Sequence, residues 1–261
     1  MLMVHSIIKE IPLHKLSDER IIDSSESCLI SEIQIESKDE FERIVSNSIP
    51  LWKRTFDIAG AIIGLVILSP LLCIITLAIK ITSHGPIFFI QERVGYLGKR
   101  FRMYKFRSMY SDADEKEHEA YVRNLITQNN GNALAMVKIP QDSRVTPLGR
   151  FLRKLSLDEL PQLINVLKGE MTLIGPRPPV PYEVEEYYPW HRKRLEMYPG
   201  ITGLWQVSGK NTTTFNQMVR LDVRYGQHVS PLMDAKILLK TIPTVLSLMI
   251  EKCATESGRK G

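Results

Sequence analysis

The sequence predicts an α+β protein that is mostly helical and associated with a membrane. Three observations support this fold class. An uncharged apolar run occupies residues 58–79, apolar and basic residues recur with helical spacing over 151–169, and residues 86–90 are typical of a short strand or an interfacial segment. The apolar run carries the membrane prediction, because about 22 helical residues extend roughly 33 Å, enough to cross a hydrocarbon core.

Length and composition set the broad limits. A chain of 261 residues allows one or two domains with a core, and its formal charge is +5. A basic balance favours anionic partners such as nucleic acid, anionic lipid or phosphorylated substrates, although it also serves solubility alone. The three cysteines are far apart and form no CxxC pair, which argues against a zinc site or a disulfide framework. Charged residues and one proline interrupt residues 1–17, so no signal peptide is expected there.

We expect four segments along the chain. Residues 1–50 are polar and form an N-terminal extension, and residues 51–82 contain the membrane helix. The main domain is expected at 83–215. A C-terminal helical segment follows at 216–261, and residues 232–250 within it are amphipathic, which suits a surface-lying or core helix better than a membrane span.

A proline interrupts the apolar run at its midpoint, in the pair Ser69-Pro70. Proline removes a helix hydrogen bond, and the Ser69 hydroxyl is able to bind a carbonyl freed by that break. Each arm would be about 16 Å long, close to half the thickness of the hydrocarbon core. Basic residues flank both ends (Lys53, Arg54 and Lys80), whereas a spanning helix usually has an asymmetric charge bias. We therefore expect a re-entrant helix; a kinked span and a buried soluble helix are the alternatives.

Basic and aromatic residues alternate after the membrane helix. Residues 99–107 interleave cations, among them Lys105 and Arg107, with Phe and Tyr. This pattern suits either the stacking of nucleic acid bases or a headgroup layer, in which cations bind lipid phosphates. Next to an apolar segment we favour the headgroup layer and expect no nucleic-acid partner. A half-buried strand with solvated charges is the alternative.

Two adjacent carboxylates, Asp158 and Glu159, precede Pro161. On a helix they would point about 100° apart, so they are suited to two different tasks at one site and not to a symmetric pair. Proline favours the first turn of a helix, so the pattern also allows Asp158 as an ordinary N-cap and Glu159 as a first-turn acid.

An arginine, Arg177, lies between prolines in residues 175–178. Prolines fix the backbone, so a guanidinium on this loop is suited to bidentate phosphate binding; a solvated arginine on a structural turn is the alternative. The sequence contains no Walker A motif, no dinucleotide fingerprint, and neither an HExxH nor a Cys/His metal set. Phosphate binding would then depend on Arg and Lys side chains together with a divalent cation held by carboxylates.

These motifs together resemble the bacterial sugar transferase family, the monotopic polyprenyl-phosphate hexose-1-phosphate transferases. The resemblance covers roughly residues 51–210 and depends on many motifs in a fixed order. The motifs include Lys53-Arg54-x-x-Asp57, Ser69-Pro70, Gln91-x-Arg93-x-Gly95, Lys105-Phe106-Arg107-Ser108-Met109, Asp142-x-x-Arg144-x-Thr146, Gly149-Arg150-x-Leu152-Arg153, Ser156-Leu157-Asp158-Glu159-Leu160-Pro161-Gln162, Gly175-Pro176-Arg177-Pro178 and Pro199-Gly200-Ile201-Thr202-Gly203.

The resemblance implies transfer of a sugar 1-phosphate from a UDP-sugar to undecaprenyl phosphate, with release of UMP. It implies that Asp158 is a nucleophile that forms an aspartyl-phosphosugar intermediate. Glu159 would assist, and the two acids would hold Mg²⁺. The basic residues implied to bind substrate phosphates are Arg177, Lys105, Arg107, Arg153 and Arg144. The pair Ser69-Pro70 matches the break of the family's re-entrant helix.

The resemblance further implies a setting at the bacterial inner (cytoplasmic) membrane. The catalytic domain, residues 83–215, would face the cytoplasm among membrane lipids and interfacial helices, and a homo-oligomer is compatible with the sequence. The reaction would be the first membrane step of exopolysaccharide or O-antigen-type glycan assembly. Residues 221–225 are similar to the branch that acts on UDP-glucose or UDP-galactose, but residues 226–231 depart from its usual pattern, which leaves the sugar open. A lipid-linked glycosyltransferase that releases UDP and a non-enzymatic membrane scaffold are the competing functions.

Overall fold

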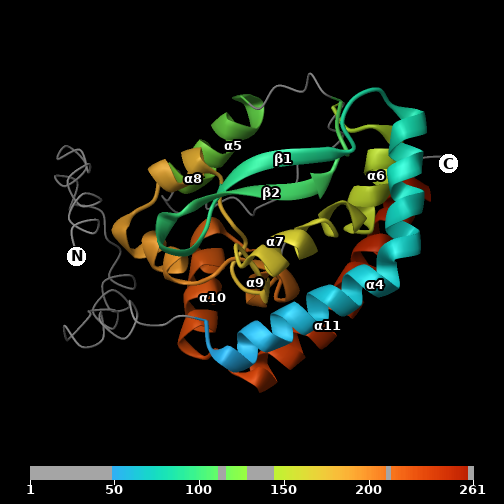
Figure 1. Cartoon of the computed structure of the whole chain (residues 1–261). Helices are drawn as coiled ribbons and strands as arrows, with labels where there is room; N and C mark the ends of the chain where they lie inside the picture. Colours follow the sequence, from blue (N-terminus) through green and yellow to red (C-terminus); the bar gives the residue numbers. More distant parts are fainter. Residues whose placement is uncertain (1–48, 111–115, 128–143, 210–212, 258–261) are drawn as a thin grey trace, which may run out of the picture. The chain divides into compact units, whose positions relative to one another are not determined.

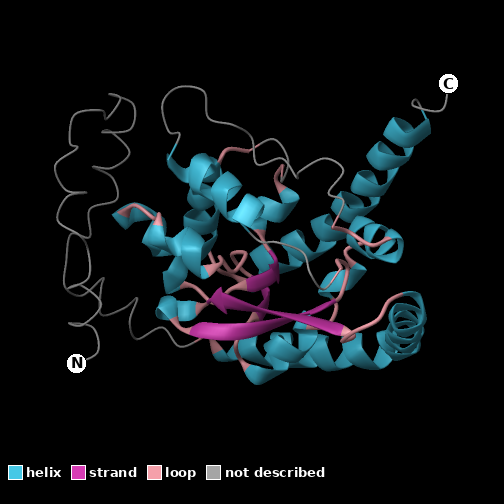
Figure 2. Cartoon of the chain, turned by 90° about the horizontal axis from the view of Figure 1, so that it is seen from above, coloured by secondary structure: helices cyan, strands magenta, loops and turns pink. Residues whose placement is uncertain are grey.

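The computed structural model describes residues 49–110, 116–127, 144–209 and 213–257 (Figure 1). The polar extension expected at 1–50 lies outside the described residues, apart from its last two. From Ile49 onward the chain forms one compact unit, so the expected segments that follow pack together. The prediction of a mostly helical α+β fold is confirmed for the described part, in which helices lie on both sides of the strands (Figure 2).

The chain enters the described part through helix α4 (Leu51–Thr82), which leads into an antiparallel hairpin of strands β1 (Phe88–Val94) and β2 (Arg100–Phe106). The later α-helices are α5 (Lys116–Thr127), α6 (Pro147–Lys154), α7 (Gln162–Lys168), α8 (Pro181–Glu185), α9 (Leu204–Val207), α10 (Phe215–Gln227) and α11 (Pro231–Ser257). Two short parallel strands, β3 (Thr172–Ile174) and β4 (Gly200–Thr202), form a second sheet. The 3₁₀ helices are η2 (Tyr96–Gly98), η3 (Leu157–Glu159) and η4 (Pro189–Glu196).

Helix α4 contains Pro70 and bends near its middle, as Figure 1 shows. Pro70 has no N–H to bind the carbonyl of Val66, and the Ser69 hydroxyl donates to that carbonyl instead, at 2.8 Å. The expectation that Ser69 binds a carbonyl freed by the proline is therefore confirmed. The bend divides the apolar helix into two arms set at an angle, which is the shape that a re-entrant helix requires.

Most of the apolar surface of α4 is exposed. In its most apolar 18-residue stretch only 11% is buried inside the structure, and Ile63, Val66 and Ile67 are 57, 67 and 69% exposed. A core helix of a soluble domain would bury such side chains, so the structure contradicts the alternative of a buried soluble helix. By length and composition α4 is able to cross a bilayer, which indicates membrane association.

Charged residues in the first two turns of α4 attach the helix to the rest of the unit. Arg54 donates to the carbonyls of Val166 and Leu167 at the C-terminal end of α7, at 2.7 and 3.0 Å. Asp57 is fully buried and accepts the Leu173 N–H of β3 at 2.9 Å. The first arm of α4 is thus fixed to the two elements that follow the acid pair in the chain.

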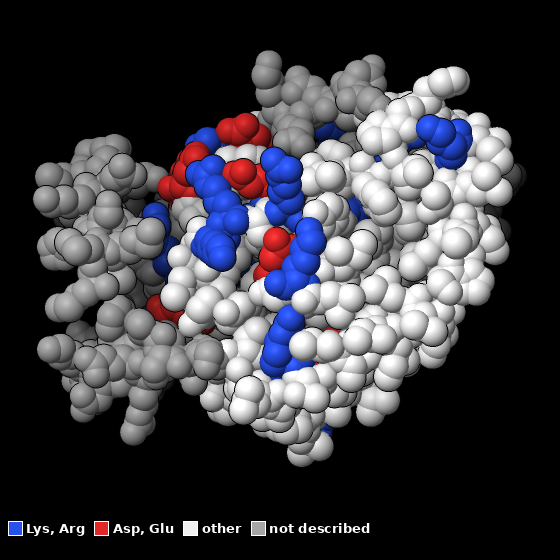
Figure 3. Space-filling model, in the orientation of Figure 1, with Lys and Arg blue, Asp and Glu red and all other residues white. Residues whose placement is uncertain are grey.

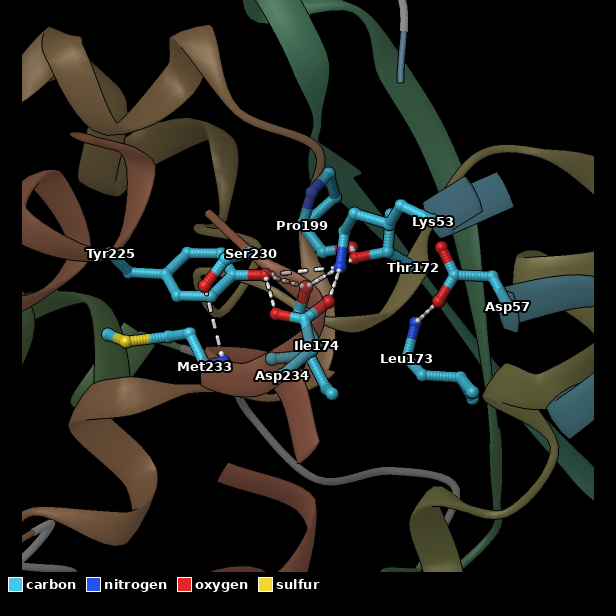
Figure 4. A network of polar contacts seen from close by, with 10 residues as sticks. All are labelled: Lys53, Asp57, Thr172, Leu173, Ile174, Pro199, Tyr225, Ser230, Met233 and Asp234. Atoms are coloured by element: carbon cyan, nitrogen blue, oxygen red, sulfur yellow. Dashed lines mark hydrogen bonds and ion pairs between the residues drawn. The ribbon is translucent and has the colours of Figure 1, made fainter. Parts of the chain in front are cut away.

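A second set of contacts joins α4 to β3, α10 and α11 (Figure 4). Lys53 Nζ donates to the carbonyl of Ile174 at 2.9 Å and forms an ion pair with Asp234 at 2.6 Å. The Tyr225 hydroxyl lies 2.7 Å from Asp234 Oδ1. The N-terminal ends of α4 and α11 therefore meet beside the end of β3, directly before the loop that carries Arg177.

Candidate active site

The acid pair lies in one 3₁₀ turn, η3, between α6 and α7. Helix α7 has Pro161 at its N-cap and no side-chain cap, so the alternative in which Asp158 is an ordinary N-cap is wrong. Asp158 is buried and Glu159 is half-buried. Ser156, which precedes the turn, has φ of 55°. This left-handed conformation costs about 1–3 kcal/mol in a non-glycine residue and is concentrated at functional sites.

Two cations contact the carboxylate of Glu159. Lys105 Nζ of β2 lies 3.1 Å from Glu159 Oε1, and Arg177 Nη1 lies 3.4 Å from the same oxygen. The Lys105 and Glu159 side chains are 14 and 20% exposed, whereas the Arg177 side chain is 35% exposed. The structure thus brings together four of the predicted site residues, the acid pair among them, and leaves the arginine side of the cluster open to an incoming ligand.

A third cation, Arg93 of β1, belongs to the same electrostatic cluster. Burial lowers the pKa of Lys105, and the charges of Arg177 and Arg93 add to this, whereas Glu159 and Asp158 oppose it. Burial, together with the charge of Arg177, also lowers the pKa of Arg93 to about 10. Because the cations repel one another, the negative charge of a bound phosphate would stabilise the cluster.

Asn165 of α7 holds the acid turn against β2. Its Oδ1 accepts the Tyr104 N–H at 3.1 Å, and its Nδ2 donates to the Arg102 carbonyl at 2.7 Å. Both the oxygen and the nitrogen of this buried side-chain amide bind backbone groups of β2. The amide therefore fixes the position of α7 along the strand. This contact places Lys105, the next residue of β2, opposite Glu159.

Helix α6 reaches the site by close contact with the end of β2. The Thr146 side chain caps α6 by accepting the Gly149 N–H at 2.9 Å, and the Thr146 N–H donates to the Ser108 carbonyl at 3.0 Å. A Cβ atom on Gly149 would lie 2.0 Å from the Ser108 oxygen, so a side chain at this position would force α6 away. The glycine therefore lets the turn that follows α6 start close to β2.

Arg107, another predicted phosphate-binding residue, contacts the end of the membrane helix. Its guanidinium is buried and donates to the carbonyl and hydroxyl oxygens of Ser83, at 2.8 and 2.7 Å. Arg107 therefore binds the C-terminal end of α4. A basic motif does not reveal in the sequence whether its cation faces a ligand or a carbonyl of its own chain.

The two remaining predicted phosphate-binding residues are Arg153 and Arg144. Arg153 is half-buried in the last turn of α6, which packs against η3. Arg144 follows the undescribed residues 128–143, and its carbonyl accepts the Tyr110 N–H at 2.9 Å.

Arg93 and Arg194 contact the backbone around Arg177, although neither was predicted as a site residue. The sequence offered a signal for Arg93, which stands in the motif Gln91-x-Arg93-x-Gly95. It offered none for Arg194, because the acidic partners of that residue, Asp222 and Glu183, lie on other helices.

The acid pair is also the predicted ligand set of a divalent cation. Among the described residues, no group of three or more His, Cys, Asp or Glu side chains is arranged to hold a metal ion. Mg²⁺ is usually bound by one or two carboxylates together with waters and substrate phosphates. Two adjacent carboxylates match the number of protein ligands in such a site, and Mg²⁺ binding by Asp158 and Glu159 stays a prediction.

Charged side chains gather over the hairpin in Figure 3, whereas the surface along α4 is uncharged up to its last turn, which carries Lys80. Exposed apolar residues continue from α4 to the start of β1, where Phe88 and Phe89 are 40 and 41% exposed. The hairpin thus connects an apolar surface to the cations of the site. Such an arrangement is able to bind a phosphate at the level of lipid headgroups.

Comparison with known proteins identifies a family. Residues 48–248 match the model of the family described as bacterial sugar transferase. The galactosyl transferase CpsE of Streptococcus agalactiae is 46% identical over 195 residues, which cover 74% of this chain and 42% of the relative. The exopolysaccharide production protein ExoY of Sinorhizobium fredii is 42% identical over 193 residues, which cover 74% of this chain and 84% of the relative.

A further relative is the undecaprenyl-phosphate galactose phosphotransferase of Salmonella typhimurium. It is 45% identical over 195 residues, which cover 74% of this chain and 40% of the relative. The chain thus spans less than half the length of CpsE and of the Salmonella protein, and most of the length of ExoY.

Proposed function

The chain belongs to the bacterial sugar transferase family, and from this we propose that it transfers a hexose 1-phosphate from a UDP-sugar to undecaprenyl phosphate. The observation that carries the proposal is the contact of Glu159 with Lys105 and Arg177, directly beside Asp158. The names of the relatives support a hexose donor, the lipid carrier and a role in exopolysaccharide assembly.

In this proposal Asp158 acts as a nucleophile in two steps. A carboxylate oxygen attacks the phosphorus that bears the sugar, and the bond from this phosphorus to the oxygen bridging it to UMP breaks. UMP leaves with that oxygen, and an aspartyl-phosphosugar remains. An oxygen of undecaprenyl phosphate then attacks the same phosphorus, the acyl–phosphate bond breaks, and the Asp158 carboxylate is restored. A soluble nucleotide and a membrane lipid can thereby use one site in turn.

The neighbouring cations make the first step feasible. A carboxylate that approaches a diphosphate is repelled by it, and Lys105 and Arg177 offset this repulsion as charge moves to the leaving phosphate. Before substrate binds, Glu159 holds both cations at 3.1 and 3.4 Å. These positions are therefore set in advance and need not be established during the reaction.

Mg²⁺ belongs to the proposal as a partner of the acid pair. Asp158 and Glu159 would hold it together with substrate phosphates, where its charge would neutralise part of the diphosphate. The roles assigned to Lys105 and Arg177 stand independently of the metal.

The proposal includes a monotopic arrangement at the cytoplasmic face of the inner membrane. Helix α4 would enter and leave on one side, and its bend at Ser69-Pro70 supports this. Helices α6 and α11 would lie in the interface, since α6 exposes Phe151 and α11 exposes Leu239, at 55 and 69%. The site would then lie at the level of the lipid phosphate.

Nucleotide release is the test of the proposed function. The detergent-solubilised protein is incubated with undecaprenyl phosphate, Mg²⁺ and a panel of UDP-hexoses, and the nucleotide and lipid products are identified. UMP and a lipid diphosphate sugar are expected, and the active donor names the hexose. Asp158→Asn should abolish turnover and the covalent phospho-enzyme. Glu92→Gln changes an exposed carboxylate on the hairpin of β1 and β2, and it should leave turnover and the phospho-enzyme unchanged.

Other products would decide for the competing functions. Release of UDP instead of UMP would establish a glycosyltransferase that moves only the sugar. Binding to anionic vesicles without release from any UDP-hexose would favour the scaffold. Full activity of Asp158→Asn would exclude the proposed nucleophile.

A further inference from the structure

The loop that carries Arg177 is held by its carbonyl groups. Prolines occupy positions 176, 178 and 179, so three residues of this loop have no N–H with which to bind a neighbouring strand. The carbonyls of four successive residues nevertheless accept hydrogen bonds from four separate donors. These are the Gly200 N–H to Pro176 at 2.8 Å, Arg194 Nη2 to Arg177 at 3.0 Å, Arg93 Nη1 to Pro178 at 3.0 Å, and the Val94 N–H to Pro179 at 2.9 Å.

The two central donors are guanidinium groups that are buried. Arg93 and Arg194 are 8 and 2% exposed. A hydrogen bond from a charged donor in a buried setting is stronger than one between neutral groups. These two contacts hold the carbonyls of Arg177 and of the residue that follows it, and the Arg177 side chain is more exposed than either donor.

Each of the two donors is itself fixed by other side chains. Arg194 forms ion pairs with Asp222 at 2.7 Å and Glu183 at 3.2 Å, and it donates to the Tyr187 hydroxyl at 2.7 Å. Arg93 donates to Gln91 Oε1 at 2.6 Å. The guanidinium groups of Arg194 on η4 and Arg93 on β1 are therefore held in place by partners on α10, α8 and β1, and they hold the loop in turn.

We propose that Arg93 and Arg194 are positioning residues that act through the backbone of residues 176–179 to aim the Arg177 side chain at Glu159 and at the substrate phosphate. Neither residue need touch the substrate for this role. An arginine on a proline-rich loop has no regular secondary structure to orient it, and the two buried guanidiniums supply that orientation. The inference rests on the proposed function only where it is tested by the rate of turnover.

A double-mutant cycle tests whether Arg93 acts through Arg177. Arg93→Lys keeps the charge but loses the planar fork, and it should lower kcat/KM about tenfold or more, mainly through kcat. In the background of Arg177→Ala the same substitution should change kcat/KM less than twofold, because the loop no longer carries the guanidinium. Arg100→Lys, an exposed arginine on the same hairpin, is the matched control and should have no effect in either background.

A full tenfold loss in the Arg177→Ala background would overturn the proposal, because Arg93 would then act independently of Arg177. Unchanged kcat/KM in Arg93→Lys would overturn it as well. Arg93→Gln and Arg194→Lys are second variants in case Arg93→Lys does not fold, and both should follow the same pattern.

Hydrogen exchange of the loop provides a readout that does not depend on the proposed function. In Arg93→Lys, a peptide covering residues 172–184 should exchange faster than in the unmodified chain, while peptides of α10 keep their rates. Faster exchange in this peptide without any turnover by the unmodified chain would overturn the proposed function and still support the positioning role of Arg93. Unchanged exchange of the loop would overturn the positioning role.

Discussion

Lys53 and Asp234, at the starts of α4 and α11, form an ion pair of 2.6 Å in which both side chains are almost fully buried. Tyr225 and the carbonyl of Ile174 complete the hydrogen bonds around the two charges (Figure 4). A buried pair of this kind has little net worth against a well-packed apolar pair, but loss of one partner leaves an uncompensated charge. The membrane helix, the strand before the Arg177 loop and the C-terminal helix thus meet at this contact.

Loss of the Lys53 charge should therefore destabilise the whole unit. Lys53→Met is expected to lower the free energy of unfolding by about 3–5 kcal/mol, because Asp234 is left buried without its partner. Thermal unfolding in detergent measures the effect. The control is Arg100→Met, which breaks the exposed pair with Glu92 and should cost about 1 kcal/mol or less. Equal losses in the two variants would show that the buried pair contributes no more than the exposed one.

Local patterns in the sequence predicted the local features of the fold. The apolar run with Ser69-Pro70 predicted a broken helix, and Gly169 ends α7 in the left-handed conformation that glycine favours. The acid pair and Arg177 were predicted as site residues from motifs, and in the structure Arg177 contacts Glu159. The spacing of apolar residues and the preferences of turn residues depend on only a few neighbouring positions. A single sequence is therefore enough to predict the features that they determine.

Contacts between distant residues were not predictable in the same way. Lys53 was interpreted as a flanking charge of the membrane helix and as part of a family motif. Neither interpretation pointed to its partner, which lies 181 positions later in the chain. Arg107 was assigned to phosphate by its motif, and only packing shows that it binds Ser83. The role of a buried cation depends on the acidic group or carbonyl that it contacts. A single sequence does not show which of these groups the fold brings next to it.

Lys105 should contribute to the reaction through its charge beside Glu159. Lys105→Met is expected to lower kcat/KM by about 10²-fold, since one cation that offsets the diphosphate charge is removed. Steady-state rates of UMP release measure this. Lys168→Met is the matched control, because Lys168 is exposed on α7 and contacts Tyr104 on the neighbouring strand. A loss of equal size in both variants would assign the effect to the hairpin and α7 in general.

The bend in α4 should determine its topology. In a background with Cys28, Cys73 and Cys253 replaced by serine, single cysteines at Leu51 and His84 report on the two ends of the helix. Both should react with an impermeant maleimide from the cytoplasmic face only. Pro70→Ala restores the N–H that α4 lacks and should straighten the helix, which would move one label to the opposite face.

Ser69→Ala is the milder variant for the same feature. It removes the hydroxyl that binds the Val66 carbonyl, so the bend should lose stability while Pro70 still prevents a regular helix. Labelling of the two ends from opposite faces in the unmodified background would refute the re-entrant arrangement.

His191 should make the stability of the fold depend on pH below neutrality. Its ring is fully buried, Nδ1 accepts the Tyr188 N–H at 3.2 Å, and Nε2 lies 3.0 Å from Asn216 Oδ1, so the neutral ring is the form that fits. Burial, with the nearby charge of Arg194, lowers the pKa of His191 from 6.5 to about 4. Between these values the unfolded chain binds the proton and the folded chain does not. Stability contributed by the neutral ring is thus present above pH 6.5 and lost as the pH falls towards 4.

The size of this effect follows from the difference between the two pKa values and is about 3 kcal/mol at most. Unfolding curves in detergent between pH 4 and pH 7 measure it. His191→Gln keeps a donor and an acceptor but does not titrate, so its stability should decline less over the same range. His84→Gln, at an exposed histidine, should decline as the unmodified chain does. If the His191→Gln curve runs parallel to that of the unmodified chain, protonation of His191 is not what weakens the fold, because every other carboxylate and histidine is common to both proteins.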